Sequence, residues 1–447
     1  MTRPAALLTP TAARRVFLAL TVTRWFPIGL IVGITTLWPL ERGLSIEQAL
    51  AASSLVGVTV FLLELPTSGF ADAFGRRPVY LASALVCVLS GLVFYTATQW
   101  WQFALAAVLT GVFRALDSGP LEAWFVDTVH AAEPEREVDR DLSAQGMVLG
   151  VSMALGAIGS GGLVWWHPFT SHSALLLPGI LYIGLSVVHA VAIVLLLREP
   201  DRQTFSPQHG TKRALRSVRE APAVVADGLR LLRTSRVLAG LVAVELCWSA
   251  GMVVFETLQP IRLAELLGSE TRAAAVMGPV ASAGWGLFAL GAALAGLLSR
   301  RIGVAPSAIV ARTLNGLGAV VMGLVAGPVA LIGAYAFTYT MHGASGPLHS
   351  TLLHREASPR NRSTVLSINS MGGSVAFSLT ALGAGVLAAS LSTAAAMVVI
   401  GALSTAGAAF YLPALRADGQ RRRAEQVPLL TAGAGGHTPQ SGDDGTA

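Results

Sequence analysis

The sequence ELPTSGFADAFGRRPVYLAS, residues 64–83, places a cluster of charged residues in a short connection between two apolar runs. In the whole chain of 447 residues, 53% are hydrophobic, only 13% are charged, and the mean hydropathy is +0.62. A soluble domain usually carries about 25% charged residues. So little charge cannot cover a water-soluble body of this size, and the composition predicts an integral membrane protein.

Apolar runs of roughly the 20 residues that a bilayer requires occur six times before a polar segment and six times after it. They lie near residues 16–40, 47–70, 78–98, 101–128, 142–165, 174–197, 236–260, 273–298, 305–326, 328–353, 363–388 and 392–415. The pattern predicts an all-α fold of twelve transmembrane helices in two pseudo-symmetric six-helix halves, residues 1–198 and 236–415. A cytoplasmic linker at 199–235 and a disordered cytoplasmic tail at 416–447 complete the predicted organisation.

The basic residues predict the orientation of these helices. If both termini are cytoplasmic, almost all Lys and Arg residues fall on the cytoplasmic side, as the positive-inside rule requires. We therefore expect a multi-pass protein of the cytoplasmic membrane. The loops also account for the net charge of +6, so nucleic-acid binding is not expected. The exceptions are Arg42, Arg262 and Arg272 on the outer side and Arg24, Arg114 and Arg312 within spans.

In this topology residues 64–83 lie in the loop between the second and third spans. The loop resembles the signature loop of the major facilitator superfamily, Gly-x-Leu-Ala-Asp-x-x-Gly-Arg-Lys/Arg, which Asp72, Gly75, Arg76 and Arg77 match. The segment AGLLSRRIGVAPS, residues 295–307, is similar to a second copy without the Asp. The resemblance covers nearly the whole chain and implies a transporter whose two halves rock around a site at the membrane midplane.

The same resemblance implies roles for individual residues of the loop. It places Asp72 against the start of a helix in the other half, where the helix dipole stabilises a carboxylate and forms a conformational latch. It makes Asp127 the acid that pairs with a loop arginine. The alternative is that Arg76 and Arg77 only set the topology, and that Asp127 is a solvated charge at a helix end.

Charged side chains within spans are functional candidates because they are costly there. Arg114 and Asp117 are three residues apart in the fourth span and are predicted to pair on one helix face. Arg114 also resembles the arginine that the superfamily links to proton coupling. With Glu122 and Glu64 they form the predicted coupling group, with Asp117 as proton carrier. A permanent, purely structural ion pair is the alternative.

A second set of candidates is predicted to line the substrate cavity. Glu245, Trp248, Met252 and Glu256 share one helical face of the seventh span, which would suit a lipophilic cation, although one acid could be structural and the other interfacial. His342 and His349 share a face of the tenth span and are either proton-coupling groups or satisfied hydrogen-bonding residues. The remaining cavity candidates are Arg24 and Asn369. No metal site is predicted, because a third ligand is not apparent.

Small residues recur along the fifth span. Their spacing resembles a motif of the superfamily's antiporters and also suits close helix packing. They are Ser152, Gly156, Ala157, Ser160 and Gly161.

These features lead to two hypotheses of function. The first is proton-coupled efflux of a small lipophilic compound by alternating access. The second is uptake of a polar solute such as a sugar, an organic ion or a peptide. Neither involves an enzyme activity or a cofactor, because the sequence carries no nucleotide-binding loop and no nucleophile constellation. The expected partners are a small-molecule substrate, protons and the lipid bilayer, and the protein is expected to be a monomer.

Overall fold

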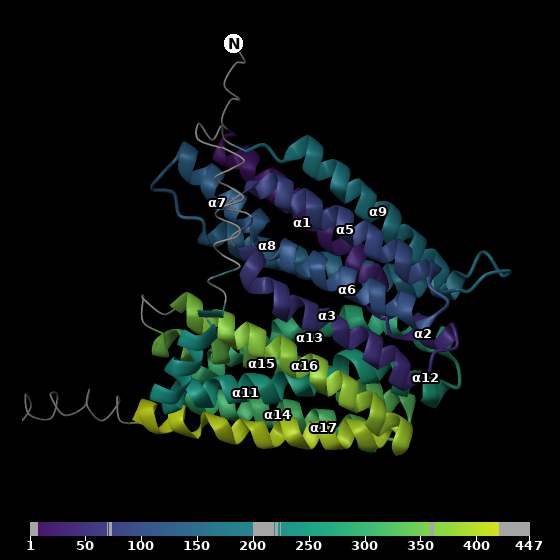
Figure 1. Cartoon of the computed structure of the whole chain (residues 1–447). Helices are drawn as coiled ribbons and strands as arrows, with labels where there is room; N and C mark the ends of the chain where they lie inside the picture. The colour runs from purple at the N-terminus through teal and green to yellow at the C-terminus, as the bar shows by residue number, and fades with distance from the viewer. Residues whose placement is uncertain are drawn as a thin grey trace, which may run out of the picture.

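The computed structural model describes residues 8–68, 70, 74–199, 219, 222–223, 225–357 and 362–419, and all regular structure within them is helical (Figure 1). The first half contains α1 (Pro10–Ile31), α2 (Leu37–Glu41), α3 (Ile46–Ser68), α5 (Arg76–Thr96), α6 (Trp100–Asp117), α7 (Pro120–Ala132), α8 (Asp139–Trp166) and α9 (Leu176–Leu196). The second half contains α11 (Arg236–Met252), η1 (Val253–Leu258), α12 (Gln259–Leu267), α13 (Glu270–Ile302), α14 (Val304–Leu324), α15 (Pro328–Glu356), α16 (Arg362–Ser390), α17 (Thr393–Gly407) and η2 (Ala408–Tyr411).

The prediction of an all-α membrane fold is confirmed. Ten helical segments in the described ranges are long and apolar enough to cross a membrane. The first and tenth expected spans, α1 and α15, are also long but less apolar. Most of the predicted linker and tail lies outside the described residues. The last helix continues to Gly419, so the predicted start of the disordered tail at residue 416 is wrong by a few residues.

The fourth predicted span is not one continuous helix, contrary to the expectation. It is divided into α6 and α7 at Ser118 and Gly119. Gly119 adopts a left-handed conformation with φ of 91°, which residues with a side chain rarely adopt. Pro120 then begins α7, where its missing N–H leaves no helical hydrogen bond unmade. The break lies near the middle of the composite span Trp100–Ala132 and exposes a helix N-terminus there.

The seventh predicted span is also irregular. α11 passes into one π-helical segment, η1, and then into α12. Pro260 at the start of α12 cannot donate the hydrogen bond that would continue a regular helix, which favours a local change of winding. The segment Arg236–Leu267 still forms one continuous path across the bundle.

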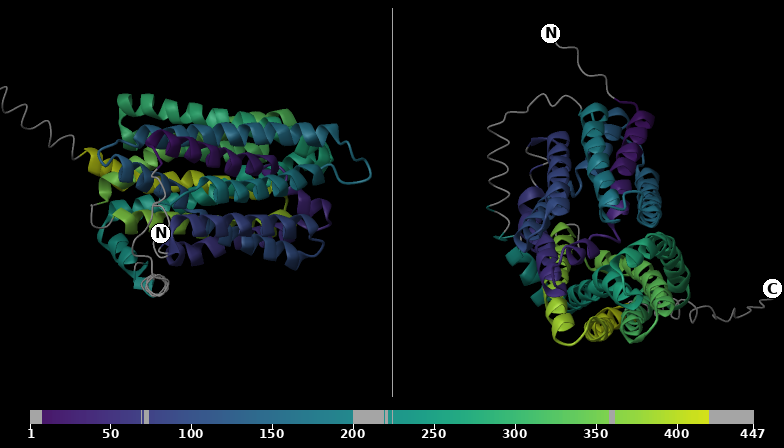
Figure 2. Two further views of the ribbon diagram at one scale, coloured as in Figure 1. Left: turned by 90° about the horizontal axis from the view of Figure 1, so that it is seen from above. Right: turned by 90° about the vertical axis from the view of Figure 1, so that its right-hand side faces the viewer.

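The two halves contact each other mainly through two helix pairs, α3 with α16 and α8 with α13 (Figure 2). Two of the small residues of the fifth span, Ala157 and Gly161, lie at the second pair. Gly161 of α8 approaches the backbone of α13 at Ala275 and Gly278 so closely that a Cβ atom on Gly278 would lie 2.5 Å from the Cα of Gly161. Gly156 makes a similar approach to Gly29 of α1. These contacts are the close packing that small residues permit.

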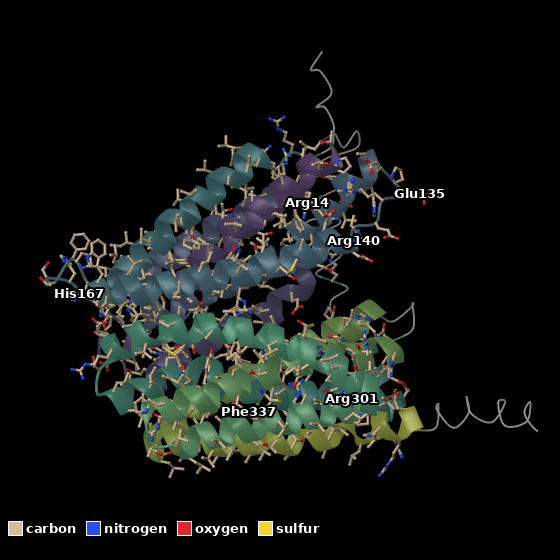
Figure 3. The ribbon with its side chains drawn as sticks, turned by 180° about the vertical axis from the view of Figure 1, so that it is seen from behind. Arg14, Glu135, Arg140, His167, Arg301 and Phe337 are labelled. Atoms are coloured by element: carbon tan, nitrogen blue, oxygen red, sulfur yellow. The ribbon has the colours of Figure 1, made fainter. Side chains whose placement is uncertain are left out.

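The apolar core is shared by the halves at one end of the bundle only. At the end that carries α2 and α12, here called the α2 end, one cluster joins residues of both halves, such as Trp38 and Leu50 with Phe255 and Ala384. At the opposite end, where the described chain begins and ends, here called the terminal end, each half has its own cluster. The halves accordingly diverge toward the terminal end, where Arg140 and Arg301 lie, and meet near the α2 end (Figure 3).

Candidate functional site

A cavity of about 370 Å³ lies within the first half, beside the break in the fourth span. Helices α1, α5, α6, α7 and α8 contribute to it, so it is formed by segments far apart in the sequence. Its lining combines two cations, two acids and an amide with aromatic and small residues. The lining residues are Arg24, Trp25, Tyr80, Arg114, Asp117, Ser118, Gly119, Leu121, Glu122 and Gln145.

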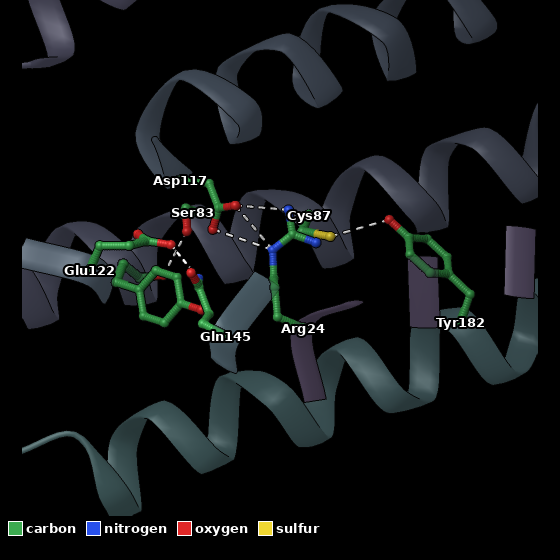
Figure 4. Close-up of polar contacts among 8 residues, drawn as sticks. Arg24, Ser83, Cys87, Asp117, Glu122, Gln145 and Tyr182 are labelled. Atoms are coloured by element: carbon green, nitrogen blue, oxygen red, sulfur yellow. Dashed lines mark hydrogen bonds and ion pairs between the residues drawn. The ribbon is translucent and has the colours of Figure 1, made fainter. Parts of the chain in front are cut away.

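Arg24 and Asp117 form a buried ion pair at this cavity (Figure 4). The Arg24 Nε and Nη2 atoms donate to Asp117 Oδ2 at 3.1 and 2.9 Å. The side chains of the two residues are only 8% and 15% exposed. The guanidinium also lies over the ring of Phe113, 4.3 Å from its centroid. The predicted partner of Asp117 was Arg114, and this prediction is wrong: the neighbouring helix α1 supplies the cation instead.

Arg114 lies on the same wall and is exposed. Within the described ranges it has neither an ion pair nor a hydrogen bond. Glu122 is held differently, since the Gln145 side-chain amide donates to its carboxylate from α8 (Figure 4). The cavity therefore carries one matched ion pair, one acid held by a neutral amide, and one cation with open coordination.

Glu64 lies at the interface between the halves and does not line this cavity. The Ser370 hydroxyl of α16 donates to Glu64 Oε1 at 3.0 Å, which links the second span to the eleventh. The other carboxylate oxygen of Glu64 is buried and has no hydrogen-bond partner among the described residues. A change in the charge of Glu64 would therefore act directly on the contact between the halves.

The signature loop is described only in part, and Asp72 lies outside the described residues. Gly75 has φ of 103°, which explains the preference for glycine there. Arg76 Nε lies 3.4 Å from Asp127 Oδ2. The Arg77 backbone N–H donates to Glu199 Oε1 at 2.9 Å, so the end of the sixth span caps the start of α5. This loop thus connects three spans of the first half.

In the second half, Glu245 belongs to a buried polar network. Its Oε2 lies 3.4 Å from His349 Nε2, and its Oε1 accepts a hydrogen bond of 3.4 Å from Ser249. His349 lies 3.3 Å from Asn369 Oδ1, and its Nδ1 lies 2.9 Å from the Tyr411 hydroxyl. Two predicted faces, the acidic face of the seventh span and the histidine face of the tenth, therefore pack against each other.

The same pairing of spans continues toward the α2 end. The rings of Trp248 and His342 lie 5.1 Å apart, and the Tyr339 hydroxyl donates to Glu256 Oε1 at 2.9 Å. Met252 is partly buried against the shared apolar cluster. The guanidinium of Arg312, from α14, lies 4.2 Å from the ring centroid of Trp248 and is fully buried.

Sequence reasoning did not select four residues that the structure places at these sites: Gln145, Arg312, Tyr339 and Ser370. The charge of Arg312 within a span was a usable signal. The other three are common in membrane helices, and only the tertiary contacts reveal them. Among the described residues, three or more His, Cys, Asp or Glu side chains nowhere gather into a potential metal site.

Comparison with known proteins identifies the family. The sequence profile of the Major Facilitator Superfamily matches residues 17–352. A comparison with curated protein sequences finds no match.

Solved structures share the fold at low sequence identity. A mutant of the nucleoside transporter NupG is 12% identical with a TM-score of 0.71, over 90% of this chain and 99% of that chain. The peptide transporter POT, a mutant in complex with sulfate, is 13% identical with a TM-score of 0.67, over 92% and 95%. A POT family transporter in complex with a thioalcohol-conjugated peptide is 14% identical with a TM-score of 0.64, over 90% and 95%.

Proposed function

Because the chain belongs to the Major Facilitator Superfamily, we propose that it is a secondary transporter that moves a small polar solute across the cytoplasmic membrane, coupled to protons. The two halves rock against each other and so expose the solute site of the first half alternately to each side of the membrane, without chemical conversion of the solute. Both termini are proposed to be cytoplasmic, as the basic residues predict. A single chain suffices, because one half forms the whole cavity lining.

The observation that carries this proposal is the distribution of the apolar core. A rocking mechanism requires two end states, each with the halves joined at one end and separated at the other. The shared cluster at the α2 end and the separate clusters at the terminal end correspond to one such state. The second state would require the contacts around Gly161 and Gly278 to open.

The charged lining supports a polar solute. Arg114 and Glu122 face the cavity together with the Arg24–Asp117 pair. A lipophilic compound would leave the Arg114 guanidinium without a polar partner, which is unfavourable. The similar structures include a nucleoside transporter and a transporter in complex with a peptide conjugate, which is in keeping with polar solutes. Uptake by proton symport is therefore the favoured direction.

Efflux of a lipophilic compound is the second candidate, and a specific observation favours it. The second half contains a continuous group of aromatic rings from η1, α13 and α15, in which neighbouring centroids lie 5.0 to 6.5 Å apart. Such rings can bind an apolar or cationic compound. The group consists of Phe255, Trp285, Phe288, Tyr335 and Tyr339.

For the proton, we propose Glu64 as the residue that couples protonation to movement. Its carboxylate accepts a hydrogen bond from Ser370 across the interface between the halves. Protonation would remove its charge and alter this contact, and thereby bias the two end states. Glu122 is the second proton-binding candidate, because it reaches the cavity itself.

The proposal is tested by transport into liposomes that contain the purified protein, with an imposed pH gradient. The solutes are nucleosides, dipeptides and amino acids, together with the cations ethidium and tetraphenylphosphonium. Gradient-dependent accumulation of a polar solute is expected, and it should be lost in Glu64→Gln but retained in the distant control Gly286→Ala. Movement of the dyes alone would favour the second candidate, and movement of no compound in the panel would contradict the proposal.

A further inference from the structure

We propose that the cavity in the first half binds a small organic anion, a carboxylate, at the junction between Arg114 and the start of α7. This inference rests on the proposed transport function and specifies its substrate class. It starts from the break in the fourth span, which places a helix N-terminus within the bundle and next to the cavity.

The start of α7 supplies donors for an anion. The first N–H groups of a helix have no partner within the helix, and they form its positive end. The N-cap residue Gly119 has no side chain that could occupy them, and none of the described hydrogen bonds caps this end from a side chain. Ser118 and Gly119 are exposed at the cavity. An anion at this position would satisfy these donors.

Arg24 provides independent support for a ligand. Although its side chain is only 8% exposed, its Nη1 atom has no hydrogen-bond partner among the residues that the structure describes. Its other two nitrogens are engaged by Asp117. A buried guanidinium nitrogen without a partner is costly. Arg24 lines the cavity, so a shift of its side chain toward a bound acceptor would remove that cost.

The charges of the lining indicate how many negative charges the site accepts. Arg24 and Asp117 neutralise each other, which leaves Arg114 and Glu122. With Glu122 ionised the lining is neutral, and with Glu122 protonated it carries one positive charge. A monoanion therefore matches the protonated state, so one proton and one anion would bind together. The aromatic rings of Trp25 and Tyr80 suit an organic body attached to the carboxylate.

The test measures the electrostatic potential at the junction without knowledge of the natural solute. In a background with Cys247→Ser, the variant Ser118→Cys is treated with two small thiol reagents, an anionic sulfonatoethyl and a cationic trimethylammonioethyl methanethiosulfonate. Each rate is normalised to that of a free thiol in solution. We expect the anionic reagent to be favoured, the preference to fall about five- to tenfold with Arg114→Gln, and to rise with Glu122→Gln. Arg272→Gln, at a distant exposed site, is the matched control.

A preference for the cationic reagent, or a ratio that Arg114→Gln leaves unchanged, would overturn the inference. Binding is then measured with pairs such as benzoate and benzamide, with the protein in phosphatidylcholine nanodiscs. At least one carboxylate should bind and stabilise the protein while its amide does not. Arg114→Gln should lower the affinity for that carboxylate about tenfold. If no carboxylate stabilises the protein more than its amide, with or without phosphatidylglycerol in the nanodiscs, the carboxylate site is contradicted. A loss of binding only when phosphatidylglycerol is added would support the anion site and show that lipid phosphate competes for it.

These outcomes are separable from the transport proposal. If the protein moves only neutral solutes and Ser118→Cys reacts equally with the two thiol reagents, the transport proposal stands and the anion-site proposal is contradicted. If Ser118→Cys prefers the anionic reagent but the protein moves none of the solutes, the anion-site proposal stands and the transport proposal is contradicted.

Discussion

Replacement of Asp117 by Asn tests the pairing at the cavity. The substitution preserves the shape of the side chain and removes the charge that faces Arg24. Removal of one partner of a buried ion pair costs roughly 3–5 kcal/mol, because the other charge stays buried without compensation. Arg24 cannot easily find another acid, since its guanidinium is enclosed by Phe113 and the ring of Trp25.

This cost translates into a measurable shift of the melting temperature. The unfolding entropy is about 2.1 cal/mol/K per residue, so for 447 residues roughly 1 kcal/mol corresponds to 1 °C. Asp117→Asn is therefore expected to lower the melting temperature by about 3–5 °C. Arg114→Gln is the matched comparison on the same helix, and its change should stay within about 1 °C, because Arg114 has no ion pair in the described ranges.

The assay is thermal unfolding of the purified variants, followed by tryptophan fluorescence in one detergent. A double-mutant cycle with Arg24→Gln isolates the pair, and a coupling energy of at least about 1 kcal/mol is expected. Equal losses of melting temperature in Asp117→Asn and Arg114→Gln would contradict the Arg24–Asp117 pairing. Additive destabilisation by the Arg24 and Asp117 substitutions in the double variant would contradict it as well.

Three further predictions concern the helix break and the interface. Gly119→Ala should cost about 1–2 kcal/mol because φ is 91° there, whereas Gly146→Ala, in open space on α8, should be neutral or stabilising in the same unfolding assay. Gly278→Ala should force α8 away from α13 and lower the melting temperature, while Gly286→Ala, in open space on the same helix, should not; equal melting temperatures would contradict the close packing of the two helices. Ser370→Ala should destabilise the protein by about 0.5–1.5 kcal/mol through its hydrogen bond to Glu64. In a Glu64→Ala background, which lacks the acceptor, the same substitution should have no effect, and an undiminished effect there would contradict that origin.

Much of the fold could be predicted from the sequence because the bilayer imposes a length on each apolar run. Within the described residues, the positions of the twelve membrane-spanning segments follow from that constraint. The break at Gly119 was visible as the Ser-Gly-Pro sequence, but the surrounding apolar residues favoured an uninterrupted span. The π-helical segment before Pro260 could not be located, because a change of winding depends on packing with neighbouring helices.

The sequence predicted which charged residues belong to the candidate site, but it did not predict which of them pair with each other. Charges within spans identified Arg24, Arg114, Asp117 and Glu122, and the structure places all four at one cavity. The sequence spacing favoured a pair between Arg114 and Asp117 on one helix. The structure instead pairs Asp117 with a residue 93 positions away. Tertiary packing, which brings α1 against α7 just after the break, sets this pairing, and spacing cannot reveal it.

Alternating access itself is tested most directly by distances between spin labels at the two ends of the bundle. Labels at Arg140→Cys and Arg301→Cys report the terminal end, and labels at Arg42→Cys and Arg272→Cys report the α2 end, in a Cys247→Ser background reconstituted in nanodiscs. When the pH is changed or a transported solute is added, we expect the terminal-end distance to shorten while the α2-end distance lengthens. Distances that stay fixed under every condition, or that lengthen and shorten together, would contradict a rocking movement of the two halves.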